Sequence, residues 1–316
     1  HVQIDGGIFD IKTGNGSTAA TTTKSQKGIK SSVLISINGG QLDLDTQDDG
    51  LHSNHEIVIQ GGDIDIKTAD DGVHADQKVT VSNGKLTIEK SREGVEAIEI
   101  NFNGGEVKIT STDDGINAAG GDGSNTGWGG TISEVGEVNI RAGYLYINAG
   151  GDGLDSNGTI VISGGTTIVN GPTSDGNGPI DVGDRSGYLS MMGGLLIATG
   201  SSGMAVGPTQ GSQYSLIARH SSAINSSSRY VITDSNNNPL LSFIPAKTSY
   251  SFVVSSPDFL SQDYRLYTGG TIHNPTVTFD GLSLGGTYET GSLLTSWTFS
   301  SSNVHVSYGS SNNRPR

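Results

Sequence analysis

The stretch Asp48-Asp49-Gly50-Leu51-His52-Ser53 decides the fold of this chain, because close copies of it recur at nearly constant intervals. The copies read Asp70-Asp71-Gly72-Val73-His74-Ala75, Arg92-Glu93-Gly94-Val95-Glu96-Ala97 and Asp113-Asp114-Gly115-Ile116-Asn117-Ala118. Their glycines, with Gly28 before them, set a repeat of about 22 residues. A period of this length without a helical pattern predicts a solenoid, in which each repeat stacks on the next.

Two short alternating segments lie between successive phrases. In one repeat they are Glu56–Gln60 and Asp63–Lys67, on either side of a Gly-Gly turn. Strict alternation of apolar and polar residues indicates half-buried strands, and the short stretch Val73–Ala75 supplies a third. A propeller is the structural alternative, but its blades need about twice this period.

The sequence therefore predicts an all-β fold, a right-handed parallel β-helix with about 22 residues and three strands per coil. We expect the glycines to supply the positive φ values that its corners demand. The pattern changes near Gln210. We expect residues 1–210 to form the β-helix, residues 211–308 to form a C-terminal β cap or final coils, and residues 309–316 to be a disordered or vector-derived tail.

The composition limits the possible partners. The chain of 316 residues has 32 acidic and 18 basic side chains, a net charge of −14. This charge argues against nucleic acid, whose binding rests on basic patches. No apolar stretch is long enough to span a membrane, so we expect no membrane insertion. The absence of cysteine is compatible with an extracellular protein that uses no disulfides.

Within each phrase the aliphatic residue should point inward and the residue after it outward. The neighbouring carboxylates then stack along the solenoid, where like charges repel and raise one another's pKa values. Such a column indicates a bound cation. Calcium is favoured because it takes six to eight oxygen ligands, whereas zinc would need more His or Cys. The predicted metal ligands are Asp48, Asp49, Asp70, Asp71, Glu93, Glu96, Asp113, Asp114, Asn117, Asp152 and Asp155.

Two features complicate this interpretation. Asp before Gly is also typical of turns, where the carboxylate accepts backbone hydrogen bonds, so any single Asp could be a turn former. Arg92 replaces a carboxylate, and we expect it to form salt bridges with neighbouring acids and to divide the column into separate sites. After an interruption the phrase returns at Asp152-Gly153-Leu154-Asp155-Ser156 and, more loosely, around Asp175-Gly176.

Aromatic residues near the column are candidate sugar contacts, together with Arg92. An inserted loop between Gly115 and Gly153 holds Trp128 among glycines. Insertions in solenoids often lie on the binding face, so Trp128 could stack on a sugar ring or fold back over the coil. Tyr144 and Tyr146 should both project outward and form either a sugar platform or ordinary surface packing.

The sequence predicts no catalytic residue. It has no nucleophile elbow, and its acids are so plentiful that a pair of carboxylates is uninformative. The base of a lyase would have to come from Lys90, Arg92, Arg141 or Arg185, none of which is marked by its context.

The strand pattern followed by Asp-Asp-Gly-apolar-His/Asn-Ala resembles the signature of a bacterial family of carbohydrate-binding parallel β-helix proteins. That family is similar in fold to pectate lyases and other polysaccharide lyases and is known from cellulose-degrading clostridia. The resemblance covers residues 30–205 and extends to Ser249–Pro257 and Tyr267–Gly270. It implies calcium, binding of cellulose or acidic sugars, and no established catalysis.

We therefore expect a calcium-dependent polysaccharide-binding protein of plant cell-wall degradation. It would recognise cellulose or acidic sugars such as polygalacturonate, be secreted or attached to the cell surface, and act as a monomer. A metal would bridge the acidic column to a uronate carboxylate. The alternatives are an active pectate-type uronate lyase and a structural surface protein that calcium stabilises.

Overall fold

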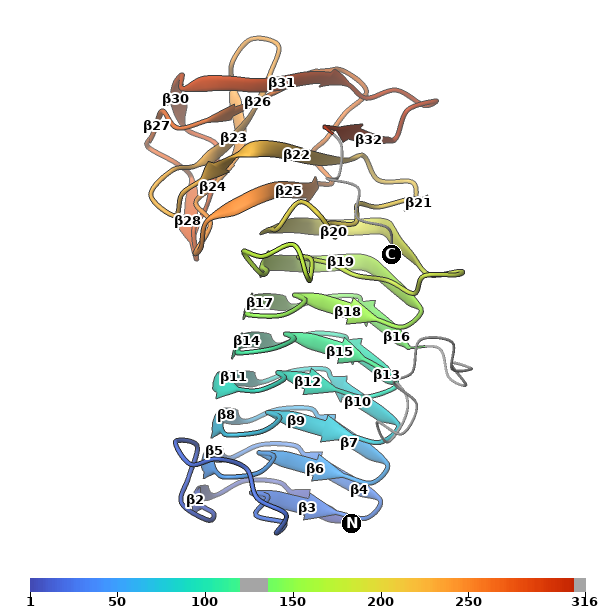
Figure 1. The fold of residues 1–316 in the computed structure, drawn as a ribbon, viewed down its shortest axis with the longest axis vertical. Coiled ribbons are helices and arrows are strands. Elements are labelled where there is room, and N and C mark those ends of the chain that lie inside the picture. The colour runs from blue at the N-terminus through green and yellow to red at the C-terminus, as the bar shows by residue number, and fades with distance from the viewer. Residues whose placement is uncertain (120–135, 310–316) are drawn as a thin grey trace.

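The computed structural model describes residues 1–119 and 136–309. In this part of the chain every regular element is a β-strand. Parallel strands stack along one long axis, and antiparallel strands lie beyond the last coils (Figure 1). Within the described residues no helix has the length and apolarity that a membrane crossing requires.

Three ladders of parallel strands run along the solenoid. The first consists of β1 (Val2–Ile4), β4 (Leu34–Ile37), β7 (Glu56–Ile59), β10 (Lys78–Val81), β13 (Glu99–Phe102) and β16 (Glu137–Ile140). The second consists of β2 (Ile8–Lys12), β5 (Gln41–Thr46), β8 (Asp63–Thr68), β11 (Lys85–Ser91), β14 (Glu106–Ser111) and β17 (Tyr144–Ala149). The long strands β19 (Thr159–Asn170) and β20 (Tyr188–Gly200) continue both, and β21 (Gln210–Gly211) pairs with β20.

The third ladder is a separate sheet made by the short strands of the repeated phrases. Its members are β3 (Ile29–Ser31), β6 (Leu51–Ser53), β9 (Val73–Ala75), β12 (Val95–Glu96), β15 (Ile116–Ala118) and β18 (Leu154–Ser156).

Equivalent positions of successive repeats lie directly above one another. In the first ladder Ile57 pairs with Ile35 on one side and with Val79 on the other. In the third ladder Leu51 pairs with Val73. These inward side chains are fully buried, with an exposed fraction of 0%. The predicted stacking of parallel strands around an apolar core is confirmed.

The glycines have two different roles, only one of which the sequence predicted. Positive φ occurs at the second glycine of the turns between strands, such as Gly62 with φ 95°. The phrase glycines lack it, so the prediction is wrong for them. A Cβ on Gly94 would lie 2.3 Å from the carbonyl oxygen of Gly115 and 2.4 Å from a methyl carbon of Ile109. Close packing of neighbouring coils therefore requires glycine at this position.

The sixth copy of the phrase lies later in the chain than predicted. The backbone N–H of Leu154 donates to the carbonyl of Pro179, as that of Ile116 does to Gly153. A parallel bridge joins Leu154 to Ile180. The copy is therefore Gly178–Asp181, and the prediction of Asp175-Gly176 is wrong, because those residues belong to the preceding loop.

Antiparallel strands cover the last coil. β25 (Ser249–Ser255) pairs antiparallel with β20 and with β22 (Ser215–Ile224), and β22 pairs in parallel with β32 (His305–Tyr308). Ile217 and Val253 belong to the solenoid core and close its end. A second antiparallel sheet contains β23 (Tyr230–Asp234), β24 (Pro239–Phe243), β26 (Asp263–Thr268), β28 (Val277–Phe279), β29 (Leu282–Leu284) and β31 (Ser292–Thr298). A small hairpin pairs β27 (Thr271–His273) with β30 (Thr287–Glu289).

Candidate metal and carbohydrate site

The third ladder carries two stacked rows of polar side chains, which we call the acidic column. The outward row consists of Lys30, His52, His74, Glu96, Asn117 and Asp155, each paired with the next. The row at the corner immediately before each phrase glycine consists of Asp49, Asp71, Glu93, Asp114 and Asp152. The repeat thus brings most of the predicted metal ligands together along one edge of the solenoid.

Four of the corner carboxylates accept backbone hydrogen bonds from the next coil, rather than from a turn of their own coil. Asp114 accepts a hydrogen bond of 2.7 Å from the backbone N–H of Asp152, and Asp152 accepts one of 2.5 Å from Gly178. Asp49 and Asp71 accept longer ones from the coil above them. In each case one carboxylate oxygen takes the bond. Because a carboxylate has two oxygens, this role is compatible with a metal ion on the other.

At the N-terminal end of the acidic column, which we call its lower end, Lys27 neutralises the carboxylates. Its Nζ lies 2.7 Å from Asp48 and 2.6 Å from Asp49. His52 Nδ1 lies 2.8 Å from the same Asp49 oxygen. Burial opposes the charge of Asp49, but the hydrogen bonds from His52 and Lys27 lower its pKa to about 2. Asp48, Asp49 and Asp70 also lie close enough together to hold an ion, but here Lys27 already compensates the charge of Asp48 and Asp49.

The middle of the column contains a charged histidine. His74 Nδ1 lies 3.0 Å from Glu96 and 3.4 Å from Asp71. Burial disfavours the imidazolium, but the hydrogen bonds with Asp71 and Glu96 raise the pKa of His74 to about 10. A protonated His74 compensates the charge of these two acids, with which it also forms one of the groups that could hold an ion.

Arg92 binds the acids around it, as the sequence predicted. Its guanidinium lies 2.9 Å from Asp70, 3.2 Å from Asp71 and 2.8 Å from Glu93. It reaches the half-exposed Asp113 at 4.0 Å. Burial opposes its charge, and the surrounding carboxylates raise the pKa of Arg92. The Arg92 side chain is 46% exposed, so solvent reaches part of it.

The upper end of the column lacks this compensation. The carboxylate oxygens of Asp114, Asp152 and Asp155 lie within 4.8 Å of one another. Among the described residues, no Lys, Arg or His side chain forms a salt bridge with them. Burial and the neighbouring acids raise the pKa to about 6 for Asp114, about 7 for Asp152 and about 8 for Asp155. We call these three residues the upper triad.

Two further oxygen donors belong to the upper triad's surroundings. Asn117 donates from Nδ2 to Glu93 over 2.9 Å, while its buried Oδ1 has no hydrogen-bond partner. Asn117 pairs with Asp155 in the ladder, next to the triad. Asp181, which follows the bridge between Leu154 and Ile180, also raises the pKa of Asp155. Carboxylates and an amide oxygen form a donor set that suits calcium rather than zinc.

The sequence missed Lys27 and Asp181. Lys27 precedes the first phrase glycine, where later copies carry acids, and that substitution was a usable signal. Asp181 follows Gly178-Pro179-Ile180, which has lost the Asp-Gly pair of the phrase. Asp181 could have been found from the pair Ile180-Asp181, which keeps the apolar residue and the outward acid of Leu154-Asp155.

The two tyrosines of the predicted platform are partly covered by the C-terminal strands. The Tyr144 hydroxyl donates to Asp280 over 2.5 Å, and its ring meets Phe279 edge-on at 5.4 Å. Tyr144 and Tyr146 both pack against the apolar cluster of the C-terminal strands. Of the two alternatives, the structure therefore shows packing for both half-buried rings, and the sugar platform stays a prediction. Trp128 lies outside the described residues.

The four candidate bases for a lyase have different surroundings. Lys90 donates to the carbonyl of Ser17, and Arg141 donates to Asn101 over 2.7 Å. Arg92 binds the acids described above, and Arg185 lies exposed in a loop. None of these side chains lies in the upper triad.

Comparison with known proteins gives one match. A family described as carbohydrate-binding domain-containing proteins matches residues 1–72 and 73–236. No curated protein and no solved structure matches the chain. The matched residues include all the coils that carry the acidic column. The chain therefore belongs to the family of carbohydrate-binding domain-containing proteins.

Proposed function

We propose that this protein is a calcium-dependent polysaccharide-binding protein of plant cell-wall degradation, secreted or attached to the cell surface. Its ligands are cellulose, acidic sugars such as polygalacturonate, or both, and its solenoid is a right-handed β-helix of about 22 residues per coil. The observation that carries the metal dependence is the upper triad, in which three acids lie within 4.8 Å of one another.

Asp114, Asp152 and Asp155 would hold the ion, with the amide oxygen of Asn117 and the carboxylate of Asp181 as further donors. A divalent cation would offset the repulsion that raises the pKa values of the triad. Calcium takes six to eight oxygen ligands, so water or sugar oxygens can complete its coordination. This is how an acidic protein would hold a uronate carboxylate. Arg92 stands one coil away as a second contact for acidic sugars.

The first test is retention on insoluble polysaccharide. We expect polygalacturonate to retain the protein in calcium and to release it in chelator, because the ion forms the bridge. Asp155→Asn should abolish this retention. The matched control is Asp63→Asn, which alters a carboxylate that is 52% exposed and bound to Lys85 at 3.4 Å.

Three outcomes would change the proposal. Retention on polygalacturonate that chelator does not affect would remove calcium from the mechanism. No retention on pectin or cellulose would leave a structural surface protein. Calcium-dependent release of unsaturated products, measured by ultraviolet absorbance, would make the protein a uronate lyase.

A second prediction concerns pH. Burial and mutual repulsion raise the pKa values of the upper triad to about 6, 7 and 8. The unfolded chain has carboxyl pKa values near ~4, so the folded protein holds more protons between about pH 4 and pH 8. Without calcium, the free energy of unfolding should therefore fall as the pH rises through this window, by at least ~2 kcal/mol.

Calcium should reverse this trend. Its ligands must be deprotonated, so the affinity for calcium should rise over the same window and binding should release protons. Thermal melts in chelator and in calcium at pH 5, 6, 7 and 8 would measure both effects. A melting temperature in chelator that rises from pH 6 to pH 8 would contradict the raised pKa values of the upper triad.

A further inference from the structure

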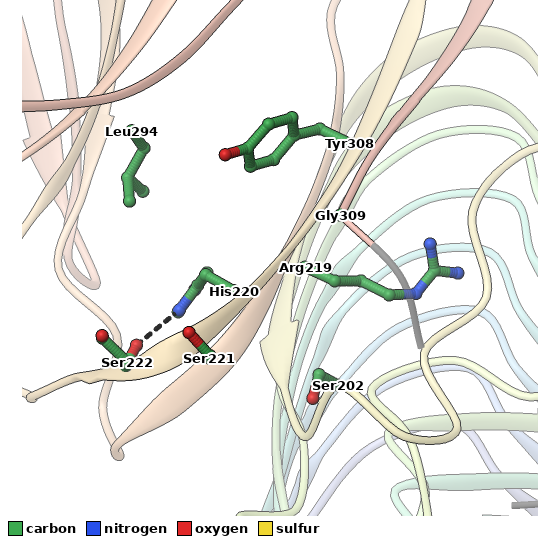
Figure 2. Close-up of a pocket in the computed structure, with 8 residues that line it drawn as sticks. All are labelled: Ser202, Arg219, His220, Ser221, Ser222, Leu294, Tyr308 and Gly309. Atoms are coloured by element: carbon green, nitrogen blue, oxygen red, sulfur yellow. Dashed lines mark hydrogen bonds between the residues drawn. The ribbon is translucent and has the colours of Figure 1, made fainter. Parts of the chain in front are cut away.

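A groove where the C-terminal strands meet the last coils contains polar and aromatic side chains that the acidic column does not use. One cavity of about 370 Å³ is lined by Ser202, His220, Ser221, Ser222, Leu294 and Tyr308, among others. Figure 2 shows Tyr308 and Leu294 across the cavity from His220, Ser221 and Ser222. A second cavity of about 280 Å³ shares Ser202, His220 and Ser221 and adds Asp175 and Tyr250. We call the two together the cap groove.

His220 contributes a rigid, uncharged ring to this groove. Its Nδ1 lies 2.6 Å from the Ser222 carbonyl and its Nε2 lies 2.7 Å from the Tyr230 hydroxyl. Because a carbonyl only accepts, Nδ1 carries the proton and Nε2 accepts from Tyr230. Burial lowers the pKa of His220, so the imidazole is neutral at neutral pH. With both nitrogens engaged, the half-buried ring can contact a ligand in the groove only through its carbon atoms.

Two tyrosines extend this aromatic surface. Tyr250 lies nearly parallel to His220, with ring centroids 6.5 Å apart and an angle of 27°. Tyr308 lines the first cavity and is 41% exposed, so a ligand can reach its ring. Tyrosine combines an apolar face with a polar hydroxyl, and this pairing suits a ligand with both characters.

The remaining lining is rich in hydroxyl groups. Ser202, Ser221 and Ser222 can each donate and accept a hydrogen bond. Asp175 is held by the backbone N–H of Gly203 at 2.9 Å and can accept from ligand hydroxyls. Apolar ring faces beside many hydrogen-bonding groups match a pyranose, which has an apolar face and a rim of hydroxyls. A volume of a few hundred Å³ is typical of small-ligand sites.

We propose that the cap groove binds a pyranose unit of a neutral polysaccharide chain, and that it does so without calcium. The proposal rests on the carbohydrate-binding function of the protein but not on the upper triad. Within the described lining, Asp175 is the one carboxylate, so the groove offers no cluster of acids for a metal ion.

The test is calorimetric titration of the whole protein with cellohexaose in chelator. We expect binding to persist there, and Tyr308→Ala to weaken it about tenfold through loss of ring stacking. The control is Tyr188→Ala, which removes a tyrosine of similar exposure, 36%, from β20. Its affinity should equal that of the parent protein.

A second variant keeps the test decisive if Tyr308→Ala does not fold. Ser221→Trp fills the groove from an exposed position and should also abolish cellohexaose binding. The proposal for the cap groove would be overturned if cellohexaose did not bind in chelator, or if its binding survived both substitutions. Oligogalacturonate in calcium tests the acidic column separately, since Asp155→Asn should affect it and Tyr308→Ala should not. The two proposals can therefore fail independently.

Discussion

In chelator, we expect the Asp155→Asn protein to be more stable than the parent protein, whereas calcium should stabilise only the parent. Asp155 lies half-buried beside Asp114 and Asp152, and this surrounding raises its pKa to about 8. An amide of the same shape removes one charge from the repelling group. Above pH 8 the variant should gain about 1–3 kcal/mol in the free energy of unfolding.

In calcium, the parent protein should instead be more stable than Asp155→Asn. At a concentration about 100 times its dissociation constant, an ion bound only by the folded state stabilises that state by about 2.7 kcal/mol. Asp155→Asn should lose nearly all of this gain. Urea unfolding with and without calcium measures both effects, and Asp63→Asn should behave as the parent protein in each. If calcium stabilised Asp155→Asn as much as the parent, the ion would have to bind outside the upper triad.

We also expect Gly94→Ala to destabilise the protein by about 3 kcal/mol. The new Cβ would lie 2.3 Å from the backbone oxygen of Gly115 and 2.4 Å from Ile109. The backbone atom belongs to the next coil, so the two coils must separate and strain the ladders on both sides. The free energy of unfolding in urea measures the cost.

Gly176→Ala is the matched control for this change. Gly176 lies in the loop before the sixth phrase, and a Cβ there would have no atom within 4 Å. The control should change the stability by less than ~0.5 kcal/mol. Equal stabilities for Gly94→Ala and Gly176→Ala would show that the coils tolerate a methyl group and that close packing does not explain the repeat's glycine.

The candidate site was predictable where it follows from the repeat itself. The register placed Asp114 in one coil and Asp152 and Asp155 in the next. The break in the pattern at Arg92 correctly indicated salt bridges. The sequence did not reveal which acids of the column are paired with a cation. Lys27 neutralises Asp48 and Asp49 from the coil below. The sequence predicts an unbroken row of acids up to Arg92, whereas the structure also places the Lys27 ammonium group at the lower end of the column.

The sequence by itself determined the solenoid, the inward ladders and the alignment of the acids. These follow from alternation and period, which are local properties that every coil repeats. Only the tertiary structure decided which acids keep an uncompensated charge, which tyrosines the cap covers and why the phrase needs glycine. Those outcomes depend on burial and on atoms from neighbouring coils or from the C-terminal strands. Electrostatic and steric interactions act through space, so residues far apart in the chain determine them.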